Sequence, residues 1–377
     1  MRSVSSPIKP SAIEPGPAER AVQNARFIGP RADISKLTEE WSSRPAVGLD
    51  TEFVRERTFF PRPGLVQVSD GQAIWLLDPI ERENFQEIMH VFENHDVIKI
   101  LHSVGEDLQI FRLLTDTVPA PLFDTQIAAA MLGFPLQCRY ESLVEECFQV
   151  SLSGGQARSN WCKRPLSPRL LEYAAQDVLW LPPLQEFLGE ALEKKDRLHW
   201  LEEDCHRLIQ SADEPSSPLI RIKGAGRLDD QGLAWLDRLA DWREQQAQSR
   251  DLPRGFILRD DVMIDLAEAG GNPNRLREVL AGLPHPVRRR HGETLQDTLG
   301  GPAPEPLERP LELVPLDTEQ RQRLKQAQKK VRSIAEEMAI DPALIASKRE
   351  LTRLIRGERP EWLDGWRGKL LGDLPTI

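Results

Sequence analysis

The stretch from Ala46 to Phe53 alternates apolar and polar side chains with a period of two. This period predicts a β-strand in which Gly48, Asp50 and Glu52 share one face and the apolar side chains share the other. Taken alone, such a pattern is typical of an edge strand whose polar face meets water. Two carboxylates on one face are also compatible with a metal site. Motifs elsewhere in the chain are needed to distinguish these two interpretations.

The stretches that follow predict an α/β arrangement. Two apolar runs flank Asp70-Gly71, which is a hairpin turn signal. Further along, strand and helix patterns alternate. Short strands that first pair and then alternate with helices predict a layer of helices on a mixed sheet. The predicted strands are 46–53, 64–68, 73–77 and 97–102, and the predicted helices are 84–93, 104–114 and 125–131.

Asp107 is an acidic residue on the apolar face of a predicted helix. It shares that face with Val104, Leu108 and Phe111, which follow helical spacing and are expected to pack on the sheet. A carboxylate turned inward is unfavourable unless it meets a cation or hydrogen-bond donors. Asp107 is therefore expected to have a specific partner.

Two patterns predict where helices begin. Ser103, followed three residues later by Glu106, fits a capping box. Asp124 precedes the helix 125–131; it is either an N-cap or a further acid of a functional site, and the positional preference favours the cap.

A third acidic motif lies on a helix that Ser167-Pro168 is expected to start. Tyr173 and Asp177 are four residues apart, so they are neighbours on one helix face. The loop before this helix, 151–166, contains Arg158, Trp161 and Arg164. It is either a cationic edge that contacts nucleic acid or an ordinary solvated loop.

The second half of the chain predicts helices only. Proline-rich linkers are expected at 211–218 and 302–306. The basic cluster Arg288, Arg289 and Arg290 is either a surface for an RNA backbone or a solvated helix face.

Composition restricts the class of protein. The chain has 377 residues, a formal charge of −10 and a mean hydropathy of −0.43. It contains no apolar run of the length that a membrane span needs, so a cytoplasmic protein without a membrane partner is expected. The net negative charge argues against a general nucleic-acid coat. Residues 1–25 are rich in Pro and Ser without periodicity, which predicts a disordered tail.

In order along the chain, the acidic motifs resemble the DEDD exonuclease superfamily, in the subclass with a tyrosine in its third motif. Longer matches resemble the bacterial ribonuclease D family, and the helical stretch near 233–243 looks like an HRDC domain. The matching stretches are Leu49-Asp-Thr-Glu-Phe-Val-Arg-Glu-Arg-Thr, His102-Ser-Val-Gly-Glu-Asp-Leu, Phe123-Asp-Thr-Gln-Ile-Ala-Ala-Ala, Trp161-Cys-Lys-Arg-Pro-Leu-Ser and Tyr173-Ala-Ala-Gln-Asp-Val.

The resemblance implies a ribonuclease H-like mixed sheet flanked by helices, followed by two all-α HRDC-like domains. The implied boundaries are 26–210 for the exonuclease, 219–301 for the HRDC domain and 310–377 for the second helical domain. The implied activity is 3′-5′ hydrolysis of RNA, with tRNA precursors as substrates and nucleoside 5′-monophosphates as products. A monomer is the expected state.

The resemblance also implies a role for each acid. Asp50 would bridge two divalent ions, Glu52 and Asp177 would complete one ion site, and Asp107 would serve the other. Carboxylates without His or Cys ligands independently favour Mg²⁺ or Mn²⁺ over zinc. Tyr173, with a usual pKa near 10, is expected to orient a water molecule. Candidate RNA contacts are Phe53, His102, Arg158, Trp161, Arg164, Arg288, Arg289 and Arg290, with a structural role for His102 equally compatible.

Two alternatives stay open at this point. A DNA exonuclease for repair or proofreading would use the same acids, because only contacts to the 2′-hydroxyl separate the two polymers. A non-catalytic RNA-binding scaffold is disfavoured by the complete set of acids together with Tyr173.

Overall fold

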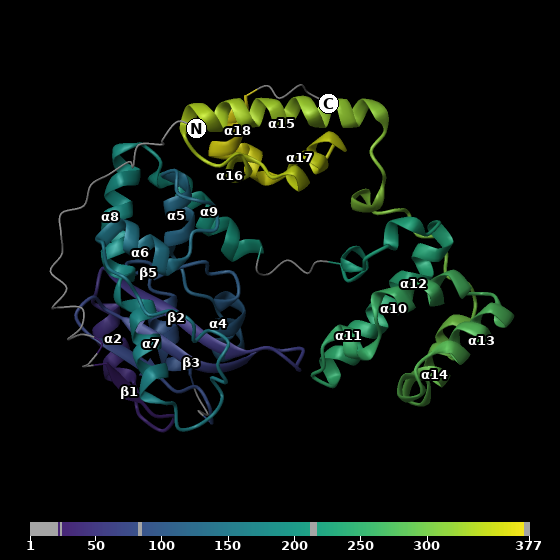
Figure 1. The fold of residues 1–377 in the computed structure, drawn as a ribbon, viewed down its shortest axis with the longest axis horizontal. Helices are drawn as coiled ribbons and strands as arrows, with labels where there is room; N and C mark the ends of the chain where they lie inside the picture. The colour runs from purple at the N-terminus through teal and green to yellow at the C-terminus, as the bar shows by residue number, and fades with distance from the viewer. Residues whose placement is uncertain (1–21, 23–24, 82–84, 212–216, 373–377) are drawn as a thin grey trace.

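The computed structural model describes residues 22, 25–81, 85–211 and 217–372. Most of the predicted N-terminal tail lies outside these residues. Figure 1 shows three parts: a sheet domain up to α9, a central helical unit (α10–α14) and a C-terminal helical unit (α15–α18) that extends from the sheet domain toward the central unit.

The sheet has six strands in the order β1-β4-β3-β2-β5-β6. β4 and β3 form the predicted hairpin, β3 and β2 are antiparallel, and β2-β5 and β5-β6 are parallel. The predicted mixed sheet is therefore confirmed. The strands are β1 (Arg26–Ile28), β2 (Ala46–Val54), β3 (Arg62–Ser69), β4 (Ile74–Leu77), β5 (Ile98–Leu101) and β6 (Leu122–Asp124).

Helices from different parts of the chain cover the sheet and contribute side chains to its hydrophobic core. Apolar side chains of β2–β5 form one hydrophobic core with those of α4–α9. The helices of the sheet domain are α2 (Ser35–Ser42), η1 (Gln86–Ile88), α3 (Met89–Phe92), α4 (Asp107–Thr115), α5 (Thr125–Met131), α6 (Tyr140–Phe148), α7 (Pro168–Leu179), α8 (Leu181–Lys194) and α9 (Leu198–Ser211).

The predicted N-cap at Asp124 is confirmed, whereas the predicted capping box at Ser103 is wrong. Asp124 accepts hydrogen bonds from the backbone amides of Gln126 and Ile127 at the start of α5. Ser103 has a left-handed backbone with φ 62°, and its amide donates to Asp124 instead. As a result α4 begins at Asp107, three residues later than predicted.

The central helical unit has a hydrophobic core of its own. Its helices, with the η2 turn that precedes them, are η2 (Leu219–Arg221), η3 (Ala225–Arg227), α10 (Asp230–Ser249), α11 (Arg254–Ile257), α12 (Asp260–Ala269), α13 (Pro273–Gly282) and α14 (His285–Gly300). Among the described residues, no helix has both the length and the apolar character needed to cross a membrane.

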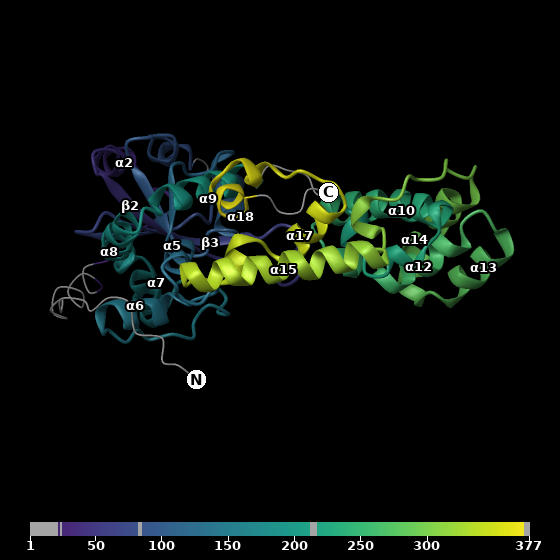
Figure 2. The same cartoon turned by 90° about the horizontal axis from the view of Figure 1, so that it is seen from above.

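The C-terminal helical unit shares the core of the sheet domain. Trp200 on α9 stacks on Trp366 with ring centroids 4.4 Å apart, and buried Asp204 pairs with Arg367. Figure 2 shows the long α15 running from the sheet domain toward the central unit. The elements are η4 (Leu311–Leu313), which precedes the unit, α15 (Thr318–Met338), α16 (Pro342–Ile345), α17 (Lys348–Ile355), η5 (Glu361–Asp364) and α18 (Trp366–Leu371).

Candidate active site

Strand β2 carries two of the predicted acids at a place where β5 no longer flanks it. β5 pairs with β2 only from Ala46 to Gly48, whereas β3 pairs with it as far as Val54. The register shifts between Glu52 and Phe53. Such a bulge bends a strand and re-aims the side chains next to it. Asp50 and Glu52 therefore lie beyond the end of β5, with space beside them for helical residues.

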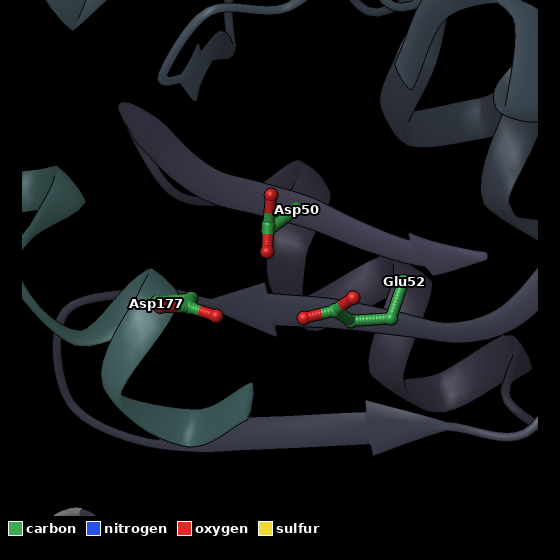
Figure 3. Close-up of side chains that lie close together, drawn as sticks. All are labelled: Asp50, Glu52 and Asp177. Atoms are coloured by element: carbon green, nitrogen blue, oxygen red, sulfur yellow. The ribbon is translucent and has the colours of Figure 1, made fainter. Parts of the chain in front are cut away.

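Helix α7 brings the third acid to this place. Ser167 caps α7 and Pro168 occupies its first turn, as the sequence predicts. The Tyr140 hydroxyl donates to the Gln176 carbonyl and accepts from the Trp180 amide, which fixes the C-terminal half of the helix. In Figure 3 the side chains of Asp50, Glu52 and Asp177 converge. One oxygen from each lies within 4.8 Å of the others.

Glu52 is buried, Asp50 and Asp177 are half-buried, and the three carboxylates lie close together, which disfavours their charged forms. Burial raises the pKa of Asp50 well above its ordinary value, and the charges of Asp107, Asp177 and Glu52 add to the effect. Burial, with the charges of Asp177 and Asp107, raises the pKa of Glu52 to about 9. Burial and the charge of Glu141 raise the pKa of Asp177 to about 8, although a hydrogen bond from Tyr173 lowers it.

The donor set fits a hard divalent cation. All three groups offer carboxylate oxygens, which are the ligands that Mg²⁺ and Mn²⁺ prefer. A bound cation would also remove the mutual repulsion that raises the pKa values of these acids. The arrangement is thus that of a metal site.

Asp107 lies outside this close group of three within the described residues. It is the first residue of α4, is buried, and accepts a hydrogen bond from the Thr51 hydroxyl. Burial raises the pKa of Asp107 to about 7, although the bond from Thr51 lowers it. Thr51 is therefore the hydrogen-bond partner that the sequence predicts for Asp107. Asp107 is also near enough to Asp50 for its charge to raise the pKa of Asp50.

Three candidate RNA contacts are engaged within the fold. The ring nitrogens of His102 lie 2.8 Å from the Thr125 hydroxyl and 2.9 Å from the Cys138 carbonyl. Trp161 is fully buried. Arg164 pairs with Asp78 through two 2.6 Å contacts. These contacts give His102, Trp161 and Arg164 structural roles, and RNA contact by these side chains stays a prediction.

The remaining candidates are accessible. Phe53 is half-buried, and Arg158 in the loop before α7 is exposed. Arg288, Arg289 and Arg290 are exposed on α14, far along the chain from the carboxylates, and Arg288 donates to the Ala281 carbonyl.

Sequence reasoning missed three neighbours of the acids. Gln67 lies opposite Asp50 in the β2–β3 register and donates to it over 3.3 Å. A single polar residue inside an apolar strand was the available signal for Gln67. Thr51 was assigned to the packing face, and the role of Glu141 depends on the fold bringing α6 beside α7.

Comparisons with known proteins agree with this geometry. Residues 26–193 match a family model described as a 3′-5′ exonuclease, and residues 232–299 match the HRDC domain. The fold and the acidic site therefore define a 3′-5′ exonuclease that carries an HRDC domain.

Curated relatives resolve the family. The chain is 32% identical to ribonuclease D of Shewanella sp. (strain ANA-3), over 96% of each chain, and 36% identical to that of Xanthomonas oryzae pv. oryzae, over 89% of this chain and 94% of the relative. The crystal structure of Escherichia coli RNase D superimposes with a TM-score of 0.84 at 32% identity, covering 93% of this chain and 98% of that chain. The protein belongs to the ribonuclease D family.

Proposed function

We propose that this protein is a 3′-5′ exoribonuclease that hydrolyses RNA from its 3′ end and releases nucleoside 5′-monophosphates. The observation that carries the proposal is the group formed by Asp50, Glu52 and Asp177, in a chain of the ribonuclease D family. The substrates we propose are tRNA precursors, because the E. coli relative is described as an exoribonuclease involved in structured RNA processing. The enzyme acts as a monomer in the cytoplasm.

In this mechanism the acids would hold two divalent ions, Mg²⁺ or Mn²⁺. Asp50 would serve both ions, Glu52 and Asp177 would complete one site, and Asp107, held by a hydrogen bond from Thr51, would serve the other. The cations would supply positive charge for the attacking and leaving oxygens of an in-line displacement.

Tyr173 orients the attacking water in this mechanism. Burial, with the charges of Asp177 and Glu52, raises the pKa of the Tyr173 hydroxyl. The hydroxyl therefore keeps its proton at neutral pH and serves as a donor and an orienting group. Its hydrogen bond to Asp177 couples the position of the water to that of the acid.

The substitution Asp177→Asn tests this assignment. It removes one ligand charge with little change in shape, so we expect hydrolysis of a 3′-extended RNA to fall more than about 100-fold. In EDTA the melting temperature should not fall, because the substitution removes a carboxylate whose ionised form is disfavoured by burial and by the charge of Glu141. Asp196→Asn, at an exposed position of the sheet domain, is the matched control. Near wild-type turnover by the Asp177 variant would remove the mechanism.

Metal removal and polymer choice complete the test. EDTA should abolish hydrolysis and Mg²⁺ or Mn²⁺ should restore it; full activity in chelator would contradict the site. A 3′-extended tRNA should be degraded faster than single-stranded DNA of equal length, with Asp177→Asn as the blank. The reverse order would favour the DNA exonuclease.

The exposed arginines of α14 are proposed RNA contacts. Replacing Arg288, Arg289 and Arg290 by Glu should weaken RNA binding and flatten its dependence on salt, because fewer counterions are released. An unchanged salt slope would mean that these side chains form a solvated helix face. Phe53 and Arg158 are further proposed RNA contacts.

A further inference from the structure

A cavity of about 730 Å³ lies where η2, η4 and α17 meet, outside the carboxylate site. In both views α17 lies on the side of the C-terminal unit nearest the central unit (Figures 1 and 2). Five cationic side chains and one carboxylate line it in a protein whose net charge is −10. These residues are Arg221, Lys348, Arg349, Arg353, Arg356 and Glu312.

Helix α17 presents most of these cations from one face. Lys348 and Thr352, Arg349 and Arg353, and Thr352 and Arg356 are each four residues apart, so the members of each pair are neighbours along the helix surface. The opposite face, with Leu351, Leu354 and Ile355, is buried. A capping box between Ser347 and Glu350 fixes the start of the helix. The cations are therefore held by a rigid element, which lowers the entropy lost when a ligand binds.

The cations of the cavity differ in their partners. Arg353 pairs with Glu358 over 2.6 Å, and Arg356 donates to the Val314 carbonyl, so both are held in place by the fold. Arg221 also has an interaction partner. The exposed side chains of Lys348 and Arg349, by contrast, have no ion pair or hydrogen bond within the described ranges. Adjacent like charges without partners are unfavourable until an anion neutralises them.

We propose that this cationic cavity binds phosphate groups of the RNA backbone, as a site separate from the one where hydrolysis occurs. Arginine and lysine together match phosphate oxygens, since arginine offers two parallel donors and lysine a point charge. The volume is within the range of ligand sites and exceeds the size of one phosphate group. This inference rests on the proposed function, because it takes RNA as the source of the phosphates.

The test measures RNA binding as a function of salt in the Asp177→Asn background, which keeps the RNA intact. The added change is K348Q/R349Q. Loss of two phosphate contacts should lower the slope of log K against log salt by about 1.4 for a single strand. Affinity at low salt should fall about tenfold.

Two further variants separate charge from structure. K348R/R349K keeps both charges and should retain the slope. K36Q/K195Q removes two exposed lysines of the sheet domain and should also leave the slope unchanged. If K348Q/R349Q has the slope and affinity of K36Q/K195Q while its melting temperature matches the wild type, the inference is overturned.

A second arm distinguishes RNA from a small anion. In the Asp177→Asn background, tripolyphosphate should displace RNA from the protein that keeps Lys348 and Arg349, and K348Q/R349Q should abolish this displacement. If tripolyphosphate binds only to proteins that keep Lys348 and Arg349 but never displaces RNA, the cavity is a small-anion site and the RNA proposal fails. Absence of hydrolysis by the wild-type enzyme would instead contradict the proposed function, whichever result the binding experiment gives.

Discussion

At the scale of single residues, Asp124 connects two segments that position the acids. Its buried carboxylate accepts hydrogen bonds from the amides of Ser103 and Val104 before α4, as well as from two amides of α5. The loop that leads to Asp107 is thereby fixed to the start of another helix. The charge of Asp124 also helps to raise the pKa of Asp107.

Asp124→Ala should destabilise the protein by about 4 kcal/mol, because it leaves four backbone donors without their acceptor. Urea unfolding followed by tryptophan fluorescence measures this change. Asp116→Asn, at an exposed position just after α4, should change the free energy of unfolding by less than about 0.5 kcal/mol. A loss of similar size in both variants would mean that the cap is not the cause.

The carboxylates predict how metal and pH affect stability together. The pKa values of Glu52, about 9, and Asp177, about 8, lie above those of an unfolded chain. In metal-free protein, their contribution to stability is full below about pH 4 and is lost as the pH rises through 8 to 9. A divalent cation binds the ionised acids and reverses this loss.

We therefore expect saturating Mg²⁺ to raise the melting temperature by about 5 °C at pH 8.5 and by less at pH 6. Thermal unfolding with EDTA or Mg²⁺ at both pH values measures it. Asp177→Asn should reduce the Mg²⁺ effect. A Mg²⁺-induced rise in melting temperature that is larger at pH 6 than at pH 8.5 would contradict metal binding by these carboxylates.

At the scale of elements, the loop before α7 packs against β3 through a glycine. A Cβ at Gly64 would lie 2.6 Å from the Cβ of Trp161 and 2.9 Å from its backbone. Trp161 in turn lies beside Tyr173, with ring centroids 6.1 Å apart. The close approach of strand and loop thus supports the side chain that we propose to orient the water.

Gly64→Ala should cost about 1–3 kcal/mol and reduce the rate of RNA hydrolysis, because the added methyl displaces the loop and Tyr173 with it. Urea midpoints and steady-state rates measure the two effects. Gly282→Ala is the matched control, since a Cβ at Gly282 meets nothing within 4 Å. Equal stability and rate for both variants would show that the loop adjusts freely.

The elements predicted best are those with local causes. Asp124 and the apolar run after it predicted α5 as residues 125–131, which is where the helix lies. The start of α4 was predicted wrongly because Ser103 donates to Asp124, a residue 21 positions away. Likewise, the loop composition around Arg164 gave no sign of Asp78, 86 positions earlier, which holds Arg164 in an ion pair. Long-range partners of this kind are not visible in local patterns.

At the scale of the whole molecule, the three parts are attached in different ways. The C-terminal unit shares a core with the sheet domain, whereas the central unit has a separate core. Asp204 and Arg367 form a buried pair across the first junction, and Arg197 donates to the carbonyls of Met131 and Met338. We therefore expect the C-terminal unit to unfold together with the sheet domain.

Arg367→Met should destabilise this common body by about 3–5 kcal/mol, because buried Asp204 loses its two close guanidinium contacts and keeps the more distant Arg207, 3.9 Å away. In calorimetry, the melting temperature shared by the sheet domain and the C-terminal unit should fall. The melting temperature of the central unit should stay unchanged. A shift confined to a separate small transition would mean that the C-terminal unit unfolds alone.

The central unit contacts the sheet domain through Asp251. Its carboxylate accepts hydrogen bonds from the amides of Phe59, 3.0 Å, and Phe60, 2.9 Å, in the segment between β2 and β3. Arg254 lies over the Phe59 ring, 4.6 Å from its centroid. Because β2 also carries Asp50 and Glu52, this contact fixes the central unit relative to the strand of the acidic site.

Two substitutions at Asp251 separate the contact from the backbone. Asp251 has a left-handed backbone, φ 48°, which both Gly and Asn tolerate. Asp251→Gly removes the acceptor, so the Phe59 and Phe60 amides should exchange hydrogen about tenfold faster. Asp251→Asn keeps an acceptor oxygen and should retain protection. Unchanged amide exchange in Asp251→Gly would show that the two parts are held together without this contact. Hydrolysis of a dinucleotide should stay unchanged in both variants, because neither substitution moves the acids of the active site.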